Sequence, residues 1–186
     1  MDSSNSIQTA TAPIPVDLFV SKKHPGLTRG EIGFADSSGN IVFKVNRQSS
    51  AKIVVLNSIG NPLVSLYHQD KGLWQGFKGD DGGEKDLMFR VQRMLNRLTR
   101  TEFDVFLFGE NQEESTSDVK MKGFPFRRSC TIFKGNSIVA QVCMINTSLM
   151  YKLHQIYARR NRFRLTIFPG SFDTTLIVAL VAIFFD

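Results

Sequence analysis

The stretch Leu176-Ile-Val-Ala-Leu-Val-Ala-Ile-Phe-Phe185 decides the fold, because no polar residue interrupts it. A helix that crosses a membrane needs about 20 consecutive apolar residues, and this run has about half of that. A short helix that is apolar on every side is typical of a protein interior. We therefore expect a buried terminal helix that begins near Asp173, Thr174 or Thr175, all of which are acceptable N-cap residues.

Two segments upstream of this helix, 32–45 and 53–66, share one pattern of strand, turn and strand. The turn in each is Asx-x-x-Gly-Asn, which starts at Asp36 in the first and at Asn57 in the second. The Asx side chain can accept hydrogen bonds from its own turn, and the glycine can adopt a positive φ. The pattern predicts two consecutive hairpins.

Most of the remaining chain alternates apolar and polar residues, which indicates further strands. These strands are expected near residues 15–20, 73–78, 87–92, 103–108, 118–122, 130–134, 138–144 and 163–167. Residues 148–160 have helical spacing and predict an amphipathic helix, with a late strand plus a loop as the alternative. A mainly β protein with about 12 strands and one apolar helix suggests a closed antiparallel barrel around a buried hydrophobic C-terminal helix, since closure removes the sheet edges.

Several motifs resemble those of the plant LURP-one-related family, which shares a tubby C-terminal-like fold with phospholipid scramblases. They are Val55-Leu-Asn-Ser-Ile-Gly-Asn-Pro-Leu63, Leu73-Trp-Gln-Gly-Phe-Lys-Gly79, Phe126-Arg-Arg-Ser-Cys-Thr-Ile-Phe133, Ile138-Val-Ala-Gln141 and Ile177-Val-Ala-Leu180. The resemblance implies a twelve-stranded barrel around the terminal helix and no established enzymatic activity. It also implies a link with plant pathogen defence and, by way of tubby proteins, binding of phosphatidylinositol bisphosphate. The region 145–162 fits the family pattern poorly.

The domain organisation follows from composition. Residues 1–13 are predicted to be a disordered tail, and residues 14–186 a single domain. The tail has no apolar signal segment, which predicts a cytoplasmic protein that is not secreted, with a peripheral membrane or nuclear location as the alternatives. The chain has 2 cysteines, too few for a disulfide framework. If Gly135-Asn136 is a two-residue turn, Cys130 faces Gln141 and both cysteines stay reduced.

The charge of the chain favours an acidic partner. A net charge of +6 suits phosphoinositides, anionic membranes or nucleic acid. Arginine in particular binds phosphate oxygens through its forked guanidinium. The candidate anion ligands are Lys120, Lys122, Arg127, Arg128, Arg159, Arg160, Arg162 and Arg164, and a further basic group comprises Arg90, Arg93, Arg97 and Arg100. The alternative for each group is a solvated strand face or loop.

Other functional classes have weaker support. Phe124 and Phe126 beside two arginines would suit single-stranded nucleic acid, but the sequence has no RNP-like, zinc-finger or helix-turn-helix pattern. The acidic loop 80–86 lacks the glutamate that an EF-hand needs at its twelfth position. The three histidines, His24, His68 and His154, lack metal-ligand spacing.

No nucleophile elbow or P-loop is present either, so we expect neither an enzyme nor a cofactor. The sequence thus predicts a non-enzymatic, monomeric, intracellular binding or regulatory module. Its expected ligand is an anionic phosphoinositide headgroup at a membrane. The alternatives are a scaffold for an unknown protein partner in defence signalling and a scramblase-like translocator of lipid.

Overall fold

The structure is a computed structural model, and it describes residues 14–80, 86–97, 99–108, 119–145, 162–170 and 172–186. This part of the chain forms twelve strands, one α-helix and two short 3-10 turns. The elements are β1 (Val16–Ser21), β2 (Ile32–Ala35), β3 (Ile41–Arg47), β4 (Lys52–Asn57), β5 (Pro62–Gln69), η1 (Asp70–Gly72), β6 (Leu73–Lys78), β7 (Leu87–Asn96), β8 (Thr101–Leu107), β9 (Val119–Phe124), η3 (Pro125–Arg127), β10 (Ser129–Lys134), β11 (Ser137–Met144), β12 (Arg162–Ile167) and α1 (Thr174–Phe184). The predicted tail 1–13 and the predicted amphipathic helix 148–160 lie outside the described residues.

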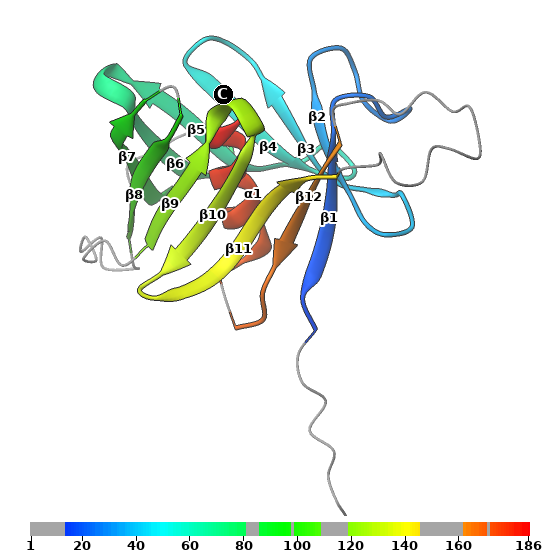
Figure 1. Cartoon of the computed structure of the whole chain (residues 1–186). Coiled ribbons are helices and arrows are strands. Elements are labelled where there is room, and N and C mark those ends of the chain that lie inside the picture. The colour runs from blue at the N-terminus through cyan, green and yellow to red at the C-terminus, as the bar shows by residue number, and fades with distance from the viewer. Residues whose placement is uncertain (1–13, 81–85, 98, 109–118, 146–161, 171) are drawn as a thin grey trace, which may run out of the picture.

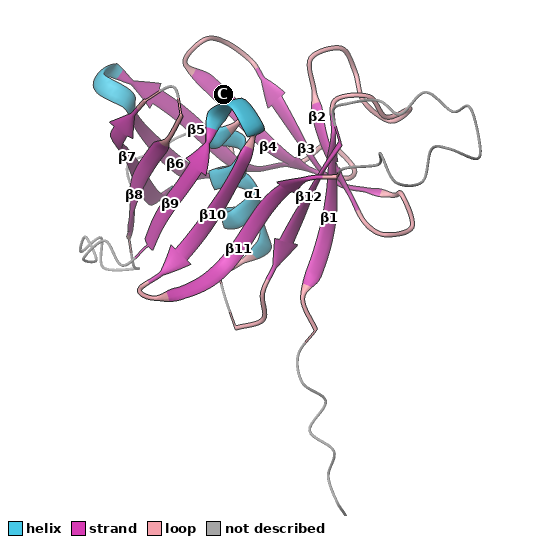
Figure 2. Cartoon of the chain, in the orientation of Figure 1, coloured by secondary structure: helices cyan, strands magenta, loops and turns pink. Residues whose placement is uncertain are grey.

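The strands follow one another around a closed barrel, in which β12 pairs with β1 to complete the ring (Figure 1). Every neighbouring pair is antiparallel, and Figure 2 shows the strands surrounding the helix. This confirms the predicted mainly β, tubby-like barrel of about 12 strands. Because neighbours alternate in direction, β1, β3, β5, β7 and β9 all end at one end of the barrel, and α1 runs back toward that end.

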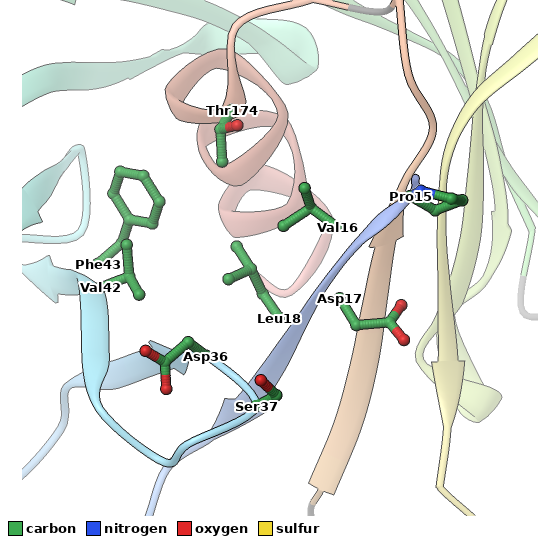
Figure 3. A pocket seen from close by; sticks show the side chains of 9 residues that line it. All are labelled: Pro15, Val16, Asp17, Leu18, Asp36, Ser37, Val42, Phe43 and Thr174. Atoms are coloured by element: carbon green, nitrogen blue, oxygen red, sulfur yellow. The ribbon is translucent and has the colours of Figure 1, made fainter. Parts of the chain in front are cut away.

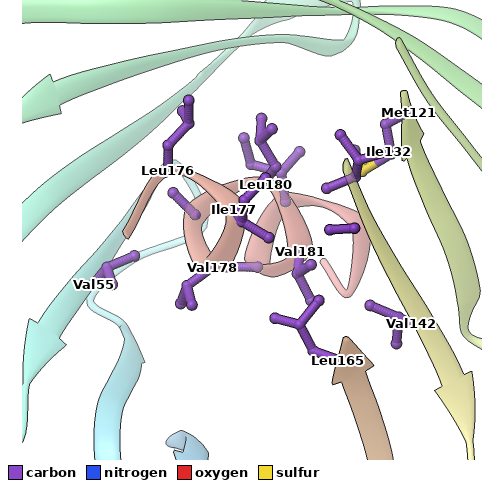
Figure 4. Close-up of a cluster of buried hydrophobic side chains, with 14 of the residues drawn as sticks. Val55, Met121, Ile132, Val142, Leu165, Leu176, Ile177, Val178, Leu180 and Val181 are labelled. Atoms are coloured by element: carbon purple, nitrogen blue, oxygen red, sulfur yellow. The ribbon is translucent and has the colours of Figure 1, made fainter. Parts of the chain in front are cut away.

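The helix fills the barrel. Residues Leu176 to Ile183 are all buried, and Ile177 and Leu180 are 0% exposed. Side chains from several strands, such as Val55 of β4 and Leu165 of β12, surround it (Figure 4). Burying one such side chain contributes about 1.5–3 kcal/mol, so the helix and the strands stabilise each other. Among the described helices, none has the length and apolar character to cross a membrane.

The two predicted hairpins are present, and their turns are built as expected. The carboxylate of Asp36 accepts the backbone N–H groups of Ser38 and Asn40, each at 2.9 Å. These bonds, that of Asn40 first, lower the pKa of Asp36. Asn57 takes the same role in the second hairpin, with the N–H of Asn61 at 2.8 Å. The turn glycines adopt positive φ, as at Gly39 with +87°.

The predicted cross-strand neighbour of Cys130 is wrong. One extra residue of β11 forms a bulge, so Cys130 lies opposite Val142 rather than Gln141. Cys130 is buried inside the barrel, and burial raises the pKa of its thiol. Cys143 is half-buried and, being adjacent to Val142, points to the other face of the sheet. Both cysteines are free, as predicted.

Candidate anion-binding rim

Cations gather at the end of the barrel where α1 finishes. Four of them, Lys22, Arg47, Arg127 and Arg128, are called the basic rim below, and all four are exposed. Lys22 follows β1, Arg47 ends β3, and the two other arginines connect β9 to β10. Figure 1 shows the C-terminus of the chain beside this last connection. Further exposed cations on connections at the same end include Lys71, Arg97 and Arg100.

The rim cations act on one another electrostatically. The pKa of the Lys22 ammonium is lowered, first by partial burial and then by the positive charges of Arg128 and Arg47. Like charges disfavour the charged form of a neighbour, and an added anion reverses that effect. Two connections and the end of β3 thus bring positive charge to one place, where a phosphate would be stabilised.

The end of α1 explains why the cations are tolerated there. The C-terminus of a helix carries a partial negative charge, which attracts cations. Asp186 forms an ion pair with Arg47. Within the described residues, ion pairs engage Arg47 but neither Lys22 nor Arg128. The helix and Asp186 therefore offset only part of the positive charge.

The connection between β9 and β10 presents two arginines and two phenylalanines. Pro125 starts one 3-10 turn, and the N–H of Arg128 closes it on the carbonyl of Pro125 at 3.0 Å. Arg128 adopts the left-handed conformation, with φ +45°, which is uncommon outside glycine. Phe126 is 81% exposed and Phe124 51% exposed. The two phenylalanines thus give this connection an exposed apolar surface directly before its two arginines.

Among the described residues, the rim has only a small crevice near its centre. A crevice between Lys22, Arg128 and Phe185 has a volume of about 10 Å³, which is at the lower limit for a single water. A headgroup would therefore lie on the rim surface, with the arginine side chains reaching over it.

Lys120 and Lys122, predicted from the sequence as ligands, lie on the outer face of β9 opposite two carboxylates. Lys120 Nζ is 4.0 Å from Asp104 Oδ1, and Lys122 is in register with Glu102. Glu102 also pairs with Arg100 at 2.5 Å. Neighbouring carboxylates make this face less suited to an anion than the rim.

The second predicted group is only partly described. Arg164 lies on the outer face of β12, where its Nη1 is 4.0 Å from Asp17 Oδ2. Arg162 begins β12 at the rim end of the barrel. Arg159 and Arg160 lie outside the described residues. In the third group, Arg90 and Arg93 pack against phenylalanine rings, each with its guanidinium carbon 5.4 Å from a ring centroid.

Lys22 and Arg47 were missed by sequence reasoning. Neither belongs to an arginine cluster, and both are far along the chain from Arg128. Only the order of strands around the barrel brings the three together. The one available signal was position, because each lies two residues beyond the predicted end of a strand, 20 in one case and 45 in the other.

A pocket at the opposite end of the barrel has different chemistry (Figure 3). Its volume is about 590 Å³, within the usual range for small-molecule sites. The lining residues are Pro15, Val16, Asp17, Leu18, Asp36, Ser37, Val42, Phe43 and Thr174. The charged members are carboxylates, and both already accept hydrogen bonds, Asp36 from its own turn and Asp17 from Thr166. This pocket does not suit an anion.

Two of the three histidines and Asp80 of the acidic loop take part in structural contacts, whereas His154 and residues 81–85 lie outside the described residues. The Nε2 atom of His24 is 2.9 Å from the carbonyl oxygen of Gly39, and His68 stacks on Trp74 with ring centroids 4.5 Å apart. Asp80 pairs with Lys52 at 2.8 Å. In the portion of the chain that the structure describes, no group of three His, Cys, Asp or Glu residues is arranged to hold a metal ion.

Comparison with known proteins identifies relatives along nearly the whole chain. The family described as LURP-one-related matches residues 16–186. Protein LURP-one-related 7 of Arabidopsis thaliana is 51% identical over 171 residues, covering 92% of this chain and 89% of the relative. Protein LURP-one-related 15 of the same plant is 32% identical, covering 94% and 81%. A crystal structure of an Arabidopsis thaliana protein superposes with a TM-score of 0.64 at 28% identity, covering 93% of this chain and 91% of that one.

Proposed function

This chain belongs to the LURP-one-related family, and from that premise we propose that it is a non-enzymatic binding module for anionic lipid headgroups. The proposed ligand is a phosphoinositide in a membrane, bound through its phosphate groups on the basic rim. The setting that we propose is the cytoplasmic side of a plant membrane, in pathogen defence, as the family resemblance implies. Arg127 and Arg128 provide the forked guanidinium groups that phosphate oxygens prefer.

One observation carries this proposal: the basic rim concentrates like charges from two connections and the end of β3. The pKa of Lys22 is lowered first by partial burial and then by the positive charges of Arg128 and Arg47, and an anion bound beside these charges would relieve their repulsion. Each Lys or Arg close to an anionic membrane contributes about 1 kcal/mol to binding. Because Arg47 is paired with Asp186, Lys22, Arg127 and Arg128 give the surface that matches several phosphates and that an isolated cation would not provide.

Lipid translocation, the scramblase-like alternative, has less support. It would require α1 to leave the barrel, and eight consecutive residues of α1 are buried there. A spanning helix needs about 20 apolar residues, whereas α1 has 11 residues in all. A scaffold that binds a protein partner remains the main rival, because a basic surface also suits an acidic protein.

The test is co-sedimentation of the full chain with vesicles of neutral lipid, with and without phosphatidylinositol bisphosphate, at low and at physiological salt. We expect binding that needs the phosphoinositide and that persists at physiological salt, where the Debye length is about 8 Å. Vesicles with phosphatidylserine at the same total charge serve as the control. Equal binding to both anionic lipids, at low salt only, would contradict the proposal and favour the scaffold.

A further inference from the structure

The turn between β9 and β10 carries a feature that headgroup binding does not use. Phe124 and Phe126 flank Pro125, and their side chains are 51% and 81% exposed. Phosphate groups offer such rings no favourable contact, and water is a poor environment for them. Phe124 and Phe126 lie directly before Arg127 and Arg128. A partner that contacts all four residues therefore needs an apolar part and an anionic part close together.

We infer that Phe124 and Phe126 insert into the membrane interface while the basic rim binds the headgroups above them. This inference rests on the proposed function and adds a membrane-inserting element to it. The boundary between headgroups and acyl chains has the required chemistry, because apolar side chains bury among the chains and cations remain at the depth of the phosphates. The partner is therefore lipid within a bilayer rather than a free inositol phosphate.

The backbone of this turn is already ordered before any membrane is bound. Pro125 fixes its own φ, and the bond from the N–H of Arg128 to the Pro125 carbonyl, at 3.0 Å, closes the 3-10 turn. Ser129 pairs with Phe124 in the barrel, so the turn begins and ends on a paired position of the sheet. A turn that is already ordered loses little conformational entropy on binding.

Packing inside the barrel stabilises the hairpin that carries this turn. The ring of Phe184 lies against Gly123, where an added Cβ would be 2.5 Å from that ring. Inward-facing Met121 and Cys130, on the two strands of this hairpin, are both buried. The hairpin thus has a packed inner face, and the exposed phenylalanines are not needed to fill the core.

The test places a tryptophan at the proposed point of insertion. The chain has one native tryptophan, Trp74, which is 1% exposed and reports on the interior. In the variant Phe126→Trp, we expect a blue-shifted emission on vesicles with phosphatidylinositol bisphosphate, and quenching by lipids brominated along their acyl chains. The wild-type protein, whose Trp74 stays inside the barrel, should show neither change and is the matched control.

A second variant measures the contribution to affinity. In Phe124→Ser/Phe126→Ser we expect vesicle binding to fall by about tenfold or more, the equivalent of one buried phenylalanine. Binding of soluble inositol trisphosphate should be unchanged, because the rim cations are intact. Thermal unfolding should match the wild type, since both rings are exposed.

The outcomes separate this inference from the proposed function. If the Phe126→Trp variant binds vesicles but its emission is neither shifted nor quenched, the insertion is overturned and headgroup capture stands, with the phenylalanines then assigned to a protein partner. Failure of the wild-type chain to bind vesicles at all would overturn both.

Discussion

The two ends of the barrel are built from the same antiparallel strands but use their polar residues differently. At the end where α1 begins, Asp36 and Asn57 bind the backbone of their own turns. At the end where α1 finishes, Lys22 and Arg128 have no such local role, and their charges act on each other. Side chains that already form hydrogen bonds within a turn are therefore poor candidates for ligand binding, whereas charged side chains without such a structural role are better candidates.

The helix α1 connects both ends of the barrel, so we expect a substitution at its centre to cause the largest change in the free energy of unfolding. Ala179 is 0% exposed, and Ala179→Asp would bury an unpaired carboxylate at a cost of several kcal/mol. A domain has about 5–15 kcal/mol of total stability, so we expect loss of cooperative folding. Circular dichroism during thermal unfolding measures this.

The matched control introduces the same residue at the start of the same helix. Thr175 lies in the first turn of α1, where a carboxylate interacts favourably with the helix N-terminus. Thr175→Asp should remain folded. A cooperative unfolding transition for Ala179→Asp close to that of the wild type would contradict the buried helix and, with it, the whole comparison of the two ends.

The attachment of α1 at the basic rim predicts an intermediate effect. A Cβ on Gly123 would be 2.5 Å from the Phe184 ring and 2.6 Å from the backbone oxygen of Ser129. We expect Gly123→Ala to reduce the free energy of unfolding by about 1–3 kcal/mol, because overpacking forces the backbone to shift. Urea unfolding measures the change.

Gly26→Ala is the control for this substitution. Its nearest new contact, with Nδ1 of His24, would be at an ordinary 3.5 Å, and we expect a change within about 0.5 kcal/mol. If the two substitutions changed the free energy of unfolding equally, the end of α1 would not pack closely against β9.

The smallest effect concerns the charge of Lys22. Its pKa is lowered in the folded protein, so the ammonium is disfavoured there relative to the unfolded chain. At pH values below the lowered pKa, the destabilisation caused by the charged ammonium is constant. Between the lowered pKa and the ordinary value of 10.5, the free energy of unfolding rises with pH, because the folded protein loses the proton before the unfolded chain does. Lys22→Gln should therefore stabilise the free protein at neutral pH, by no more than about 0.5 kcal/mol, because the side chain is largely solvated.

Urea unfolding of both proteins at about pH 7 and about pH 10 checks this sign. The advantage of Lys22→Gln should shrink at the higher pH, while its binding of anionic vesicles at neutral pH should be weaker than that of the wild type. If Lys22→Gln were less stable than the wild type at both pH values, Lys22 would stabilise the fold and would not be destabilised by the neighbouring cations.

The barrel could be predicted from the sequence because its signals are local. Alternation indicates each strand, and the turns at Asp36 and Asn57 contain the side chains and glycines that a tight hairpin requires. The register of β10 against β11 could not be predicted, because a bulge leaves no reliable trace in alternation. This is why Cys130 was paired with the wrong residue.

The basic rim was predictable only in part. Arg127 and Arg128 are adjacent in the sequence, and their cluster is visible there. Lys22 and Arg47 join them through the closure of the barrel, which is a long-range property. Conversely, Lys120 and Lys122 form a cluster in the sequence, yet cross-strand pairing places Asp104 and Glu102 beside them.

A paired charge reversal distinguishes attraction by the basic rim from attraction by net charge. Arg127→Glu/Arg128→Glu changes the basic rim, and Lys78→Glu/Lys134→Glu changes exposed lysines at the ends of β6 and β10, at the opposite end of the barrel, by the same net charge. For vesicles with phosphatidylinositol bisphosphate at physiological salt, the account predicts a loss of affinity of more than about tenfold in the first variant. The second variant should bind nearly as well as the wild type. Equal losses in the two variants would contradict the account, because they would show that net charge and not the basic rim attracts the membrane.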